Sequence, residues 1–271
     1  MTDLEELRIL ATAIAREAGE LILAKRAAGV RIAETKSSAT DIVTEADRAS
    51  EALIQDRVLA ARPDDGLLGE EGASREGASG VRWIIDPIDG TVNYAHGLPH
   101  YAVAIGIEVD GVPAVGVVHA PALGLEYSAA LGGGAWCNGR PLRVADPVPL
   151  GSALVGTGFS YERALRVSQT TTLTALLPRI ADIRRNGSCA LDLCAVADGL
   201  LDGYVEEGIG GPWDYVGGRV IAHEAGADSE VLTGVAGRIL VVAAPAGSYP
   251  GFRAAVEECG FVESGASKER L

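Results

Sequence analysis

The chain has 271 residues and carries 23 Lys+Arg against 37 Asp+Glu, a formal net charge of −14 at pH 7. This acidic balance argues against a general nucleic-acid-binding protein, which needs a basic surface to neutralise phosphates. Hydrophobic residues make up 48% and charged residues 22%, which is typical of a globular protein and excludes a largely disordered chain.

Two helices are predicted near the start of the chain. Residues 2–28 carry apolar side chains at helical spacing, and Thr2 with Glu5 fits a capping box. A second helix is predicted over residues 41–62 or 44–62, where a turn rich in Pro, Asp and Gly ends it.

Strands are predicted next. The apolar run 81–85 is typical of a buried strand. Residues 101–109 and 112–120 are predicted to form a hairpin, because Asp110-Gly111 between them favours a tight turn. Asn138-Gly139 indicates another tight turn.

The second half alternates strand-like and helix-like segments. A connector at 146–151 is followed by strand-like segments at 153–157, 203–206 and 238–243 and by helical segments at 188–200, 213–226 and 250–259. We therefore predict an α/β protein with an N-terminal α+β part, residues 1–146, and a C-terminal α/β part, residues 147–271.

The sequence shows no membrane-spanning or targeting segment. No apolar run approaches the roughly 20 residues of a membrane-spanning helix, and the acidic first residues do not match a signal peptide. The four cysteines, Cys137, Cys189, Cys194 and Cys259, form no Cys-x-x-Cys pair. Buried thiols in a reducing compartment are therefore a better interpretation than disulfides or zinc ligands. We expect a cytoplasmic protein without a membrane partner.

The most informative segment is 83–91, Trp-Ile-Ile-Asp-Pro-Ile-Asp-Gly-Thr. An apolar strand leads into Asp86 and Asp89, which could turn toward a common point if Pro87 bends the chain. Paired carboxylates suit Mg²⁺, which binds carboxylates together with water and substrate phosphate. The N–H groups of Gly90 and Thr91 could bind a phosphate oxygen. A plain acidic turn is the competing interpretation.

Two further segments add carboxylates. Glu70 and Glu71 follow a short apolar stretch and are flanked by glycines. Asp214 follows Pro212 in the first turn of a predicted helix, where an aspartate also stabilises the helix dipole. Acids from three distant segments together favour a metal site.

This combination resembles the inositol monophosphatase family of metal-dependent sugar phosphatases. The matching segments, spread over about residues 30–240, are Gly69-Glu70-Glu71, Asp86 to Thr91 with Asn93-Tyr94, Trp213-Asp214 leading to Glu224-Ala225-Gly226, Lys36-Ser37-Ser38 with Asp41 to Asp47, Gly132 to Gly139, and Gly187-Ser188. The resemblance implies a layered α+β and α/β sandwich, usually a homodimer.

The resemblance also implies two to three Mg²⁺ ions per site. The implied metal ligands are the side chains of Glu70, Asp86, Asp89 and Asp214 and the backbone carbonyl of Ile88. Asp86 would bridge two ions. A metal-bound water oriented by Glu70 and Thr91 would attack phosphorus, and Asp47 would orient the Thr91 hydroxyl, which makes Glu70, Thr91 and Asp47 the implied catalytic residues.

The implied substrate-binding residues include several of the metal ligands. They are Asp89, Gly90, Thr91, Gly187, Ser188, Cys189, Glu206 and Asp214. Glu206 matches a glutamate that accepts hydrogen bonds from ring hydroxyls. The link at 210–212 is one residue longer than in the family, which leaves open whether Glu206 or Glu207 faces the pocket.

Other polar residues near these motifs are not predicted to be metal ligands or catalytic residues. His96 and His100 match no ligand position. By resemblance Lys36 lies in a loop that folds over the metals, and an ordinary exposed lysine is the alternative. Arg184 and Arg185 are interpreted as surface or interface ion pairs, with a function beside an anionic substrate left open.

The predicted function is a Mg²⁺-dependent, Li⁺-sensitive phosphomonoesterase that hydrolyses inositol monophosphate, a small-molecule substrate. Alternative substrates are fructose 1,6-bisphosphate, histidinol phosphate and 3′-phosphoadenosine 5′-phosphate, because the metals determine the reaction and the rest of the pocket determines the substrate. A regulatory binding protein is a further alternative. Nothing basic in the sequence favours it, and no nucleic-acid partner is expected.

Overall fold

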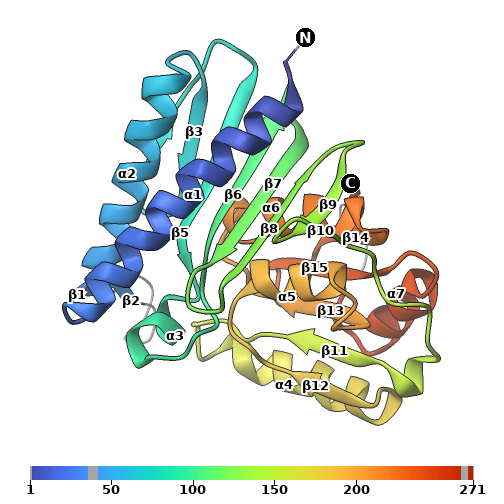
Figure 1. The fold of residues 1–271 in the computed structure, drawn as a ribbon. Coiled ribbons are helices and arrows are strands. Elements are labelled where there is room, and N and C mark those ends of the chain that lie inside the picture. The colour runs from blue at the N-terminus through green and yellow to red at the C-terminus, as the bar shows by residue number, and fades with distance from the viewer. Residues whose placement is uncertain (1, 36–41, 264–267, 271) are drawn as a thin grey trace.

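The computed structural model describes residues 2–35, 42–263 and 268–270 (Figure 1). Its helices are α1 (Leu4–Ala27), α2 (Glu45–Ala61), α3 (Thr91–His96), α4 (Leu165–Leu176), α5 (Cys189–Ala197), α6 (Pro212–Glu224) and α7 (Tyr249–Glu258), with short 3-10 turns at Leu150–Ser152 and Leu177–Arg179. Helices and sheets alternate in layers: α1 and α2, a first sheet, α5 and α6, a second sheet, and α4 with α7. The predicted α/β class is confirmed.

The first sheet has eight strands within the described residues. They are β3 (Gly66–Gly69), β4 (Ser74–Arg75), β5 (Val81–Asp89), β6 (Ala102–Val109), β7 (Val112–Ala120), β8 (Leu125–Ala130), β9 (Gly134–Cys137) and β10 (Arg140–Pro141). Their order is β10-β9-β8-β7-β6-β5-β3-β4, and every pair except β3–β5 is antiparallel. Both predicted tight turns are confirmed: Asp110 and Asn138 have φ values of 51° and 48°, and each is followed by a glycine with positive φ.

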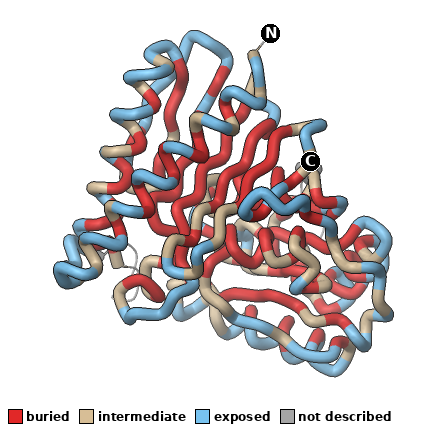
Figure 2. The backbone as a smooth tube through the Cα atoms, in the orientation of Figure 1, coloured by how far each residue is buried: buried red, intermediate tan, exposed pale blue. Residues whose placement is uncertain are grey.

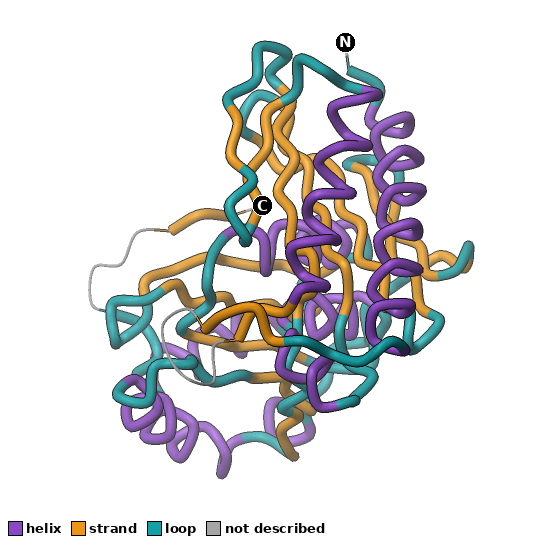
Figure 3. The backbone as a smooth tube through the Cα atoms, turned by 90° about the vertical axis from the view of Figure 1, so that its left-hand side faces the viewer, coloured by secondary structure: helices purple, strands orange, loops and turns teal. Residues whose placement is uncertain are grey.

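The first sheet is buried on both faces, which explains why β6 is an almost unbroken apolar run (Figure 2). Val103, Ile105 and Ile107 pack in one core cluster with α1 and α2. Ala102 and Ala104, on the opposite face, pack in a second cluster with α5 and α6. Figure 3 shows α1 and α2 side by side along the sheet.

The second sheet forms the other layer. Its strands are β11 (Leu154–Thr157), β12 (Asp182–Arg184), β13 (Gly203–Glu207), β14 (Ala227–Thr233), β15 (Ile239–Pro245) and β16 (Lys268–Arg270), in the order β12-β11-β13-β15-β14-β16. Strand β11 runs parallel to β12 and β13, and the remaining pairs are antiparallel. A separate ribbon joins β1 (Ile32–Thr35) and β2 (Ile42–Thr44).

Helix α6 lies unusually close to the first sheet because glycines meet at the contact. Gly106 of β6 and Gly116 of β7 are directly opposite each other in the sheet. A Cβ on Gly106 would lie 3.0 Å from the backbone nitrogen of Gly217 in α6, and a Cβ on Gly116 would overlap the Gly217 carbonyl. The helix backbone therefore rests directly on the strands, three residues after Asp214.

Some predicted boundaries are wrong for local reasons. The first helix is capped by Asp3, whose carboxylate accepts the N–H groups of Glu5 and Glu6, and not by Thr2. Strand β5 runs on past residue 85 to Asp89, so the two aspartates lie within the strand.

The predicted division at residues 146 and 147 stays a prediction, since one core cluster contains side chains of both sheets. All four cysteines are free and buried, as expected. Within the described ranges, the structure contains no helix whose length and hydropathy would suit a bilayer crossing.

Candidate active site

A cavity of about 390 Å³ lies where the two sheets and the α5–α6 layer meet. Its polar and backbone lining includes Glu70, Asp86, Ile88, Asp89, Gly90, Thr91, Glu162, Arg185, Gly187, Cys189, Glu206, Asp214 and Arg238. Most of the residues that the sequence predicted for the site therefore surround one cavity, although they come from widely separated segments.

Asp86 and Asp89 both reach the cavity because β5 is irregular between them. Asp86 is paired with Ala104 of β6 and Asp89 with Ala102, so β5 has one residue more than β6 over this stretch. Side chains three residues apart in a regular strand point to opposite faces, and the extra residue brings these two to the same face. The Ile88 N–H donates a 2.9 Å hydrogen bond to the Asp86 carboxylate and helps to orient it.

Asp214 comes from the first turn of α6. Pro212 occupies the start of the helix, where its missing N–H costs nothing. The Asp214 carboxylate accepts the N–H groups of Gly210 at 2.7 Å and Gly211 at 3.3 Å. These bonds fix the carboxylate at the helix end that faces the cavity.

Asp86, Asp89 and Asp214 form a compact acidic cluster, with one carboxylate oxygen from each lying within 4.8 Å of the other two. Burial raises the pKa of Asp89 to about 7. Burial, with the neighbouring acids, raises the pKa values of Asp86 and Asp214 well above their usual range. Carboxylates held this close repel one another unless a cation lies between them. The all-oxygen donor set fits a hard divalent cation.

Glu70 lines the same cavity at the end of β3. Its charge contributes to the raised pKa values of Asp86 and Asp214. The turn after it is held by the buried Glu51 of α2, which accepts the N–H groups of Glu71 and Ala73 at 2.8 Å each. The sequence predicted no function for Glu51, because no local pattern indicates that this helical side chain is buried against a turn.

Thr91 links the cavity to a buried acid on α2. Its hydroxyl lies 3.0 Å from Asp47 Oδ1 and 3.0 Å from the Ile88 carbonyl oxygen. The hydroxyl has one proton and can donate to one of these acceptors at a time. Asp47 also accepts the N–H and hydroxyl of Thr44 in a capping box at the start of α2. Burial raises the pKa of Asp47 to about 6, although these hydrogen bonds oppose the rise.

Asp89 also joins the two halves of the molecule. Its Oδ2 accepts the Ser188 hydroxyl at 2.6 Å and the Ala190 N–H at 2.7 Å. Ser188 caps α5 at the same time by accepting the Leu191 N–H. The first turn of α5 is therefore attached to a predicted metal ligand. Ser188 itself supports Asp89 and is not among the residues that line the cavity.

The backbone of Gly187 lies against that of Gly90. A Cβ on Gly90, which has φ of +95°, would lie 2.8 Å from the His100 carbonyl oxygen and 3.1 Å from that of Gly187. Asn93 holds this arrangement by donating its amide to the carbonyls of His100 and Asn186 at 2.7 Å each. Bulkier residues are thus excluded where the two loops meet.

The two acids at the end of β13 point in opposite directions. Glu206 lines the cavity and accepts the Tyr204 hydroxyl at 2.6 Å. Glu207 is buried on the other side, where it accepts the Ala236 N–H at 2.7 Å. Because strand side chains alternate, only one of the two can face the cavity, and the structure selects Glu206.

The family model described as "Inositol monophosphatase family" matches residues 3–260. The chain belongs to the inositol monophosphatase family. This is a family of phosphatases, so the acidic cavity is the candidate active site of a phosphatase.

Individual members of the inositol monophosphatase family agree with this assignment. The inositol-1-monophosphatase of Mycobacterium leprae is 40% identical over 276 residues, which cover 94% of each chain. The solved structure of Mycobacterium tuberculosis SuhB superposes with a TM-score of 0.83 at 39% identity, over 97% of this chain and 100% of that one. A relative from Pasteurella multocida, named Nus factor SuhB, is 39% identical over 219 residues, which cover 80% of this chain and 82% of that protein.

Some predicted residues lie elsewhere. Lys36 and Asp41, which the family resemblance singled out, fall outside the described residues. His96 and His100 are exposed and are not part of the acidic cluster.

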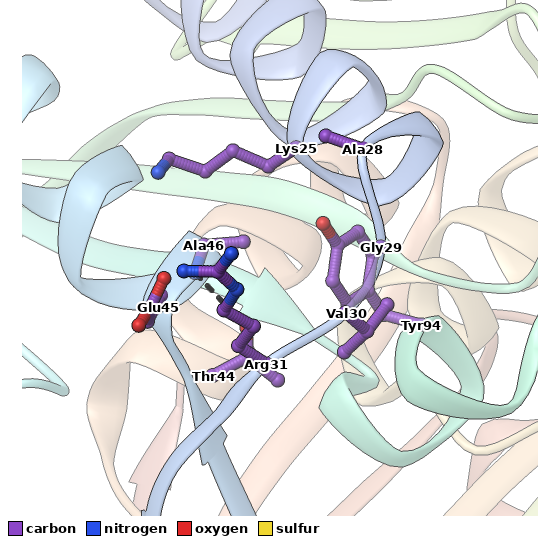
Figure 4. A pocket seen from close by; sticks show the side chains of 9 residues that line it. All are labelled: Lys25, Ala28, Gly29, Val30, Arg31, Thr44, Glu45, Ala46 and Tyr94. Carbon is purple, nitrogen blue, oxygen red and sulfur yellow. Dashed lines mark hydrogen bonds between the residues drawn. The ribbon is translucent and has the colours of Figure 1, made fainter.

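A second hollow of about 210 Å³ lies behind the Thr44–Asp47 capping box, between the end of α1 and the start of α2 (Figure 4). It is lined by Lys25, Ala28, Gly29, Val30, Arg31, Thr44, Glu45, Ala46 and Tyr94.

Proposed function

We propose that this phosphatase is a Mg²⁺-dependent phosphomonoesterase whose substrate is inositol monophosphate. The observation that supports it most is the cluster of Asp86, Asp89 and Asp214 beside Glu70 in one cavity. The name of the M. leprae relative, inositol-1-monophosphatase, supports the choice of substrate.

Two to three Mg²⁺ ions would be held by Glu70, Asp86, Asp89, Asp214 and the carbonyl of Ile88. Carboxylate and carbonyl oxygens are the ligands that Mg²⁺ prefers. When bound, Mg²⁺ supplies charge neutralisation for the phosphoryl oxygens and makes water more acidic. The charges of Glu70, Asp89 and Asp214 all act on Asp86, which suits Asp86 to hold two ions.

The chain's own residues would orient the attacking water. If the Thr91 hydroxyl donates its hydrogen bond to Asp47, its lone pairs are left to accept a hydrogen bond from the attacking water. Glu70 can accept a hydrogen bond from the second O–H of the same water. The N–H groups of Gly90 and Thr91 would bind phosphate oxygens. The alcohol that leaves would lie toward Gly187, Cys189 and Glu206, with Glu206 as an acceptor for its hydroxyls. Burial raises the pKa of the Cys189 thiol well above its usual range, so this side chain contributes shape and not a nucleophile.

The test is phosphate release from inositol 1-phosphate, fructose 1,6-bisphosphate, histidinol phosphate and 3′-phosphoadenosine 5′-phosphate, with and without added Mg²⁺. We expect activity that requires Mg²⁺, is lost in a chelator and is highest on inositol 1-phosphate. Undiminished turnover by metal-free protein in excess chelator would contradict the metal assignment. A higher kcat/KM on one of the other three substrates would correct the substrate and leave the reaction class standing.

Three further properties belong to this proposal, the first two because the family resemblance implies them. Li⁺ should inhibit turnover, and the protein should be a homodimer, which light scattering can measure. The four free, buried cysteines support a reducing, cytoplasmic environment.

A further inference from the structure

Arg185 lines the cavity. It lies between β12 and α5, two residues before Gly187. A Cβ on Gly187 would lie 2.6 Å from Arg185 Nη1, so the guanidinium rests against the glycine backbone. Gly187 in turn contacts Gly90 of the predicted phosphate-binding segment. The guanidinium is therefore close to where the leaving alcohol of a phosphomonoester would lie.

The guanidinium of Arg185 forms no hydrogen bond or ion pair with any residue that the structure describes. Its neighbour Arg184 pairs with Asp182 at 2.8 Å, and Arg238, the other arginine of the lining, pairs with Glu162 at 2.6 Å. Arg185 therefore contributes a positive charge that no described residue pairs with, in a cavity where acidic residues predominate.

The two acids whose charges interact with that of Arg185, Glu206 and Asp192, already have other hydrogen-bond donors. Glu206 accepts the Tyr204 hydroxyl at 2.6 Å, and Asp192 accepts the Asn186 amide at 2.7 Å. The Arg185 charge acts on both acids and opposes the rise in their pKa values. Because it bonds to neither, its donors remain available to a ligand. Glu206 and Arg185 together offer an acceptor and a forked donor on the same side of the cavity.

We propose that Arg185 binds the leaving alcohol and extends the activity beyond inositol monophosphate to phosphomonoesters whose alcohol carries a second anionic group, a phosphate or a carboxylate. The inference rests on the proposed phosphomonoesterase function. A guanidinium has five donors in a planar fork that matches two oxygens of such a group. Glu206 would accept a hydroxyl of the same alcohol. Arg185 is then a specificity-determining residue, and the metal-binding acids remain responsible for the reaction.

The experiment measures kcat/KM at saturating Mg²⁺ on three substrates: an aryl phosphate, inositol 1-phosphate and fructose 1,6-bisphosphate, whose alcohol carries a second phosphate. Arg185→Ala should lower kcat/KM about 10–10²-fold on the bisphosphate, the range for a lost hydrogen bond to a charged group. The loss should be smaller on inositol 1-phosphate and smallest on the aryl phosphate. Arg185→Lys, which keeps the charge and loses the fork, should fall between Arg185→Ala and the unaltered protein on the bisphosphate.

Two matched variants separate this from a general charge effect. Arg238→Ala removes the same charge from the lining but from an arginine that is already paired, and Arg184→Ala removes a neighbouring arginine outside the lining. Both should leave the ratio of the three kcat/KM values nearly unchanged. The proposal would be overturned if Arg238→Ala lowered kcat/KM on the bisphosphate as selectively as Arg185→Ala does. It would also be overturned if Arg185→Ala lowered kcat/KM equally on all three substrates.

The unaltered protein distinguishes this proposal from the proposed function. If it releases phosphate from no phosphomonoester in the presence of Mg²⁺, the phosphatase function itself fails. If it hydrolyses inositol 1-phosphate and does not act on the bisphosphate, or if Arg185→Ala leaves the substrate ratio unchanged, only the assignment of Arg185 fails. Arg185 is exposed, so its truncation should leave the fold intact, which an unchanged Tm verifies.

Discussion

The two ends of the cavity are built in different ways. At the inner end, Asp86 and Asp89 are only 2% and 8% exposed, and strand pairing and backbone N–H groups hold them in place. At the outer end, Arg185 is exposed, and the loop that carries Glu162 is attached to Arg238 by an exposed ion pair. Exposed ion pairs contribute little to stability, so this end is held much less firmly.

The difference separates two properties of the proposed enzyme. The inner end would determine the reaction, because its acids have few alternative positions. The outer end would determine the alcohol, because Arg185 and Arg238 are exposed there and can be exchanged without disturbing the core. Substitutions at the inner end should therefore affect all substrates alike, and substitutions at the outer end should change their ranking.

The largest effect is expected from Asp86→Asn. The change removes the charge from the most buried acid of the cluster and keeps its size, so the fold should persist while metal binding is lost. We expect kcat to fall on every substrate by more than about 10²-fold, the upper range for loss of a residue that merely supports a metal ligand. Near-normal kcat, with circular dichroism unchanged, would contradict the ligand assignment.

Thr91→Ala should have a smaller effect, which is still equal on all substrates. It removes the hydroxyl between Asp47 and the cavity. Orientation of water is one part of general acid–base assistance, so we expect a loss of at most about 10²-fold in kcat. Thr91→Ser keeps the hydroxyl and is the matched control. A serine variant as slow as the alanine variant would show that Thr91 acts through its packing.

Glu206→Gln should be selective. Loss of one charged acceptor should lower kcat/KM on inositol 1-phosphate by about tenfold, the value of one good hydrogen bond. Hydrolysis of an aryl phosphate, which has no ring hydroxyls, should be nearly unaffected. Equal losses on both substrates would show that Glu206 supports the site as a whole.

The smallest effect concerns stability and not turnover. Burial raises the pKa of Asp192 from 3.8 to about 8. The folded state therefore retains a proton that the unfolded state has lost, and the free energy of unfolding falls as the pH rises between these two values, by at most about 1.4 kcal/mol per pH unit. Asp192→Asn removes this dependence.

Thermal unfolding at pH 5 and pH 8 in saturating Mg²⁺ measures the effect. The variant should gain Tm relative to the unaltered protein at pH 8 and gain less at pH 5. The same difference in Tm at both pH values would mean that Asp192 does not carry a shifted pKa.

Much of the fold follows from local sequence signals. Asp110-Gly111 predicts its hairpin because few residues adopt positive φ, and the apolar runs predict β5 and β6 because buried strands need no polar face. Helix α4 was missed because its many Thr residues have low helix propensity, and packing of Leu173 and Leu176 compensates for this.

The sequence predicted which residues form the site more fully than it predicted how these residues are arranged. Spacing alone places Asp86 and Asp89 near each other, whereas the bulge that aligns them depends on how β5 pairs with β6. The choice between Glu206 and Glu207 depends on which face of β13 borders the cavity. The support that Glu51 gives to the Glu70 turn is a contact over 20 residues, which no local pattern indicates.

The glycine contact between α6 and the first sheet has a consequence for how this family can vary. Asp214 and Asp86 belong to different layers, and their separation is governed by main chain touching main chain at Gly106, Gly116 and Gly217. The Val216 side chain packs against Gly106 at that junction, and backbone lies directly against backbone at Gly116 and Gly217. Evolution can therefore exchange core residues around α6 while the spacing of the two carboxylates stays the same, and a single methyl group at the junction would move them apart.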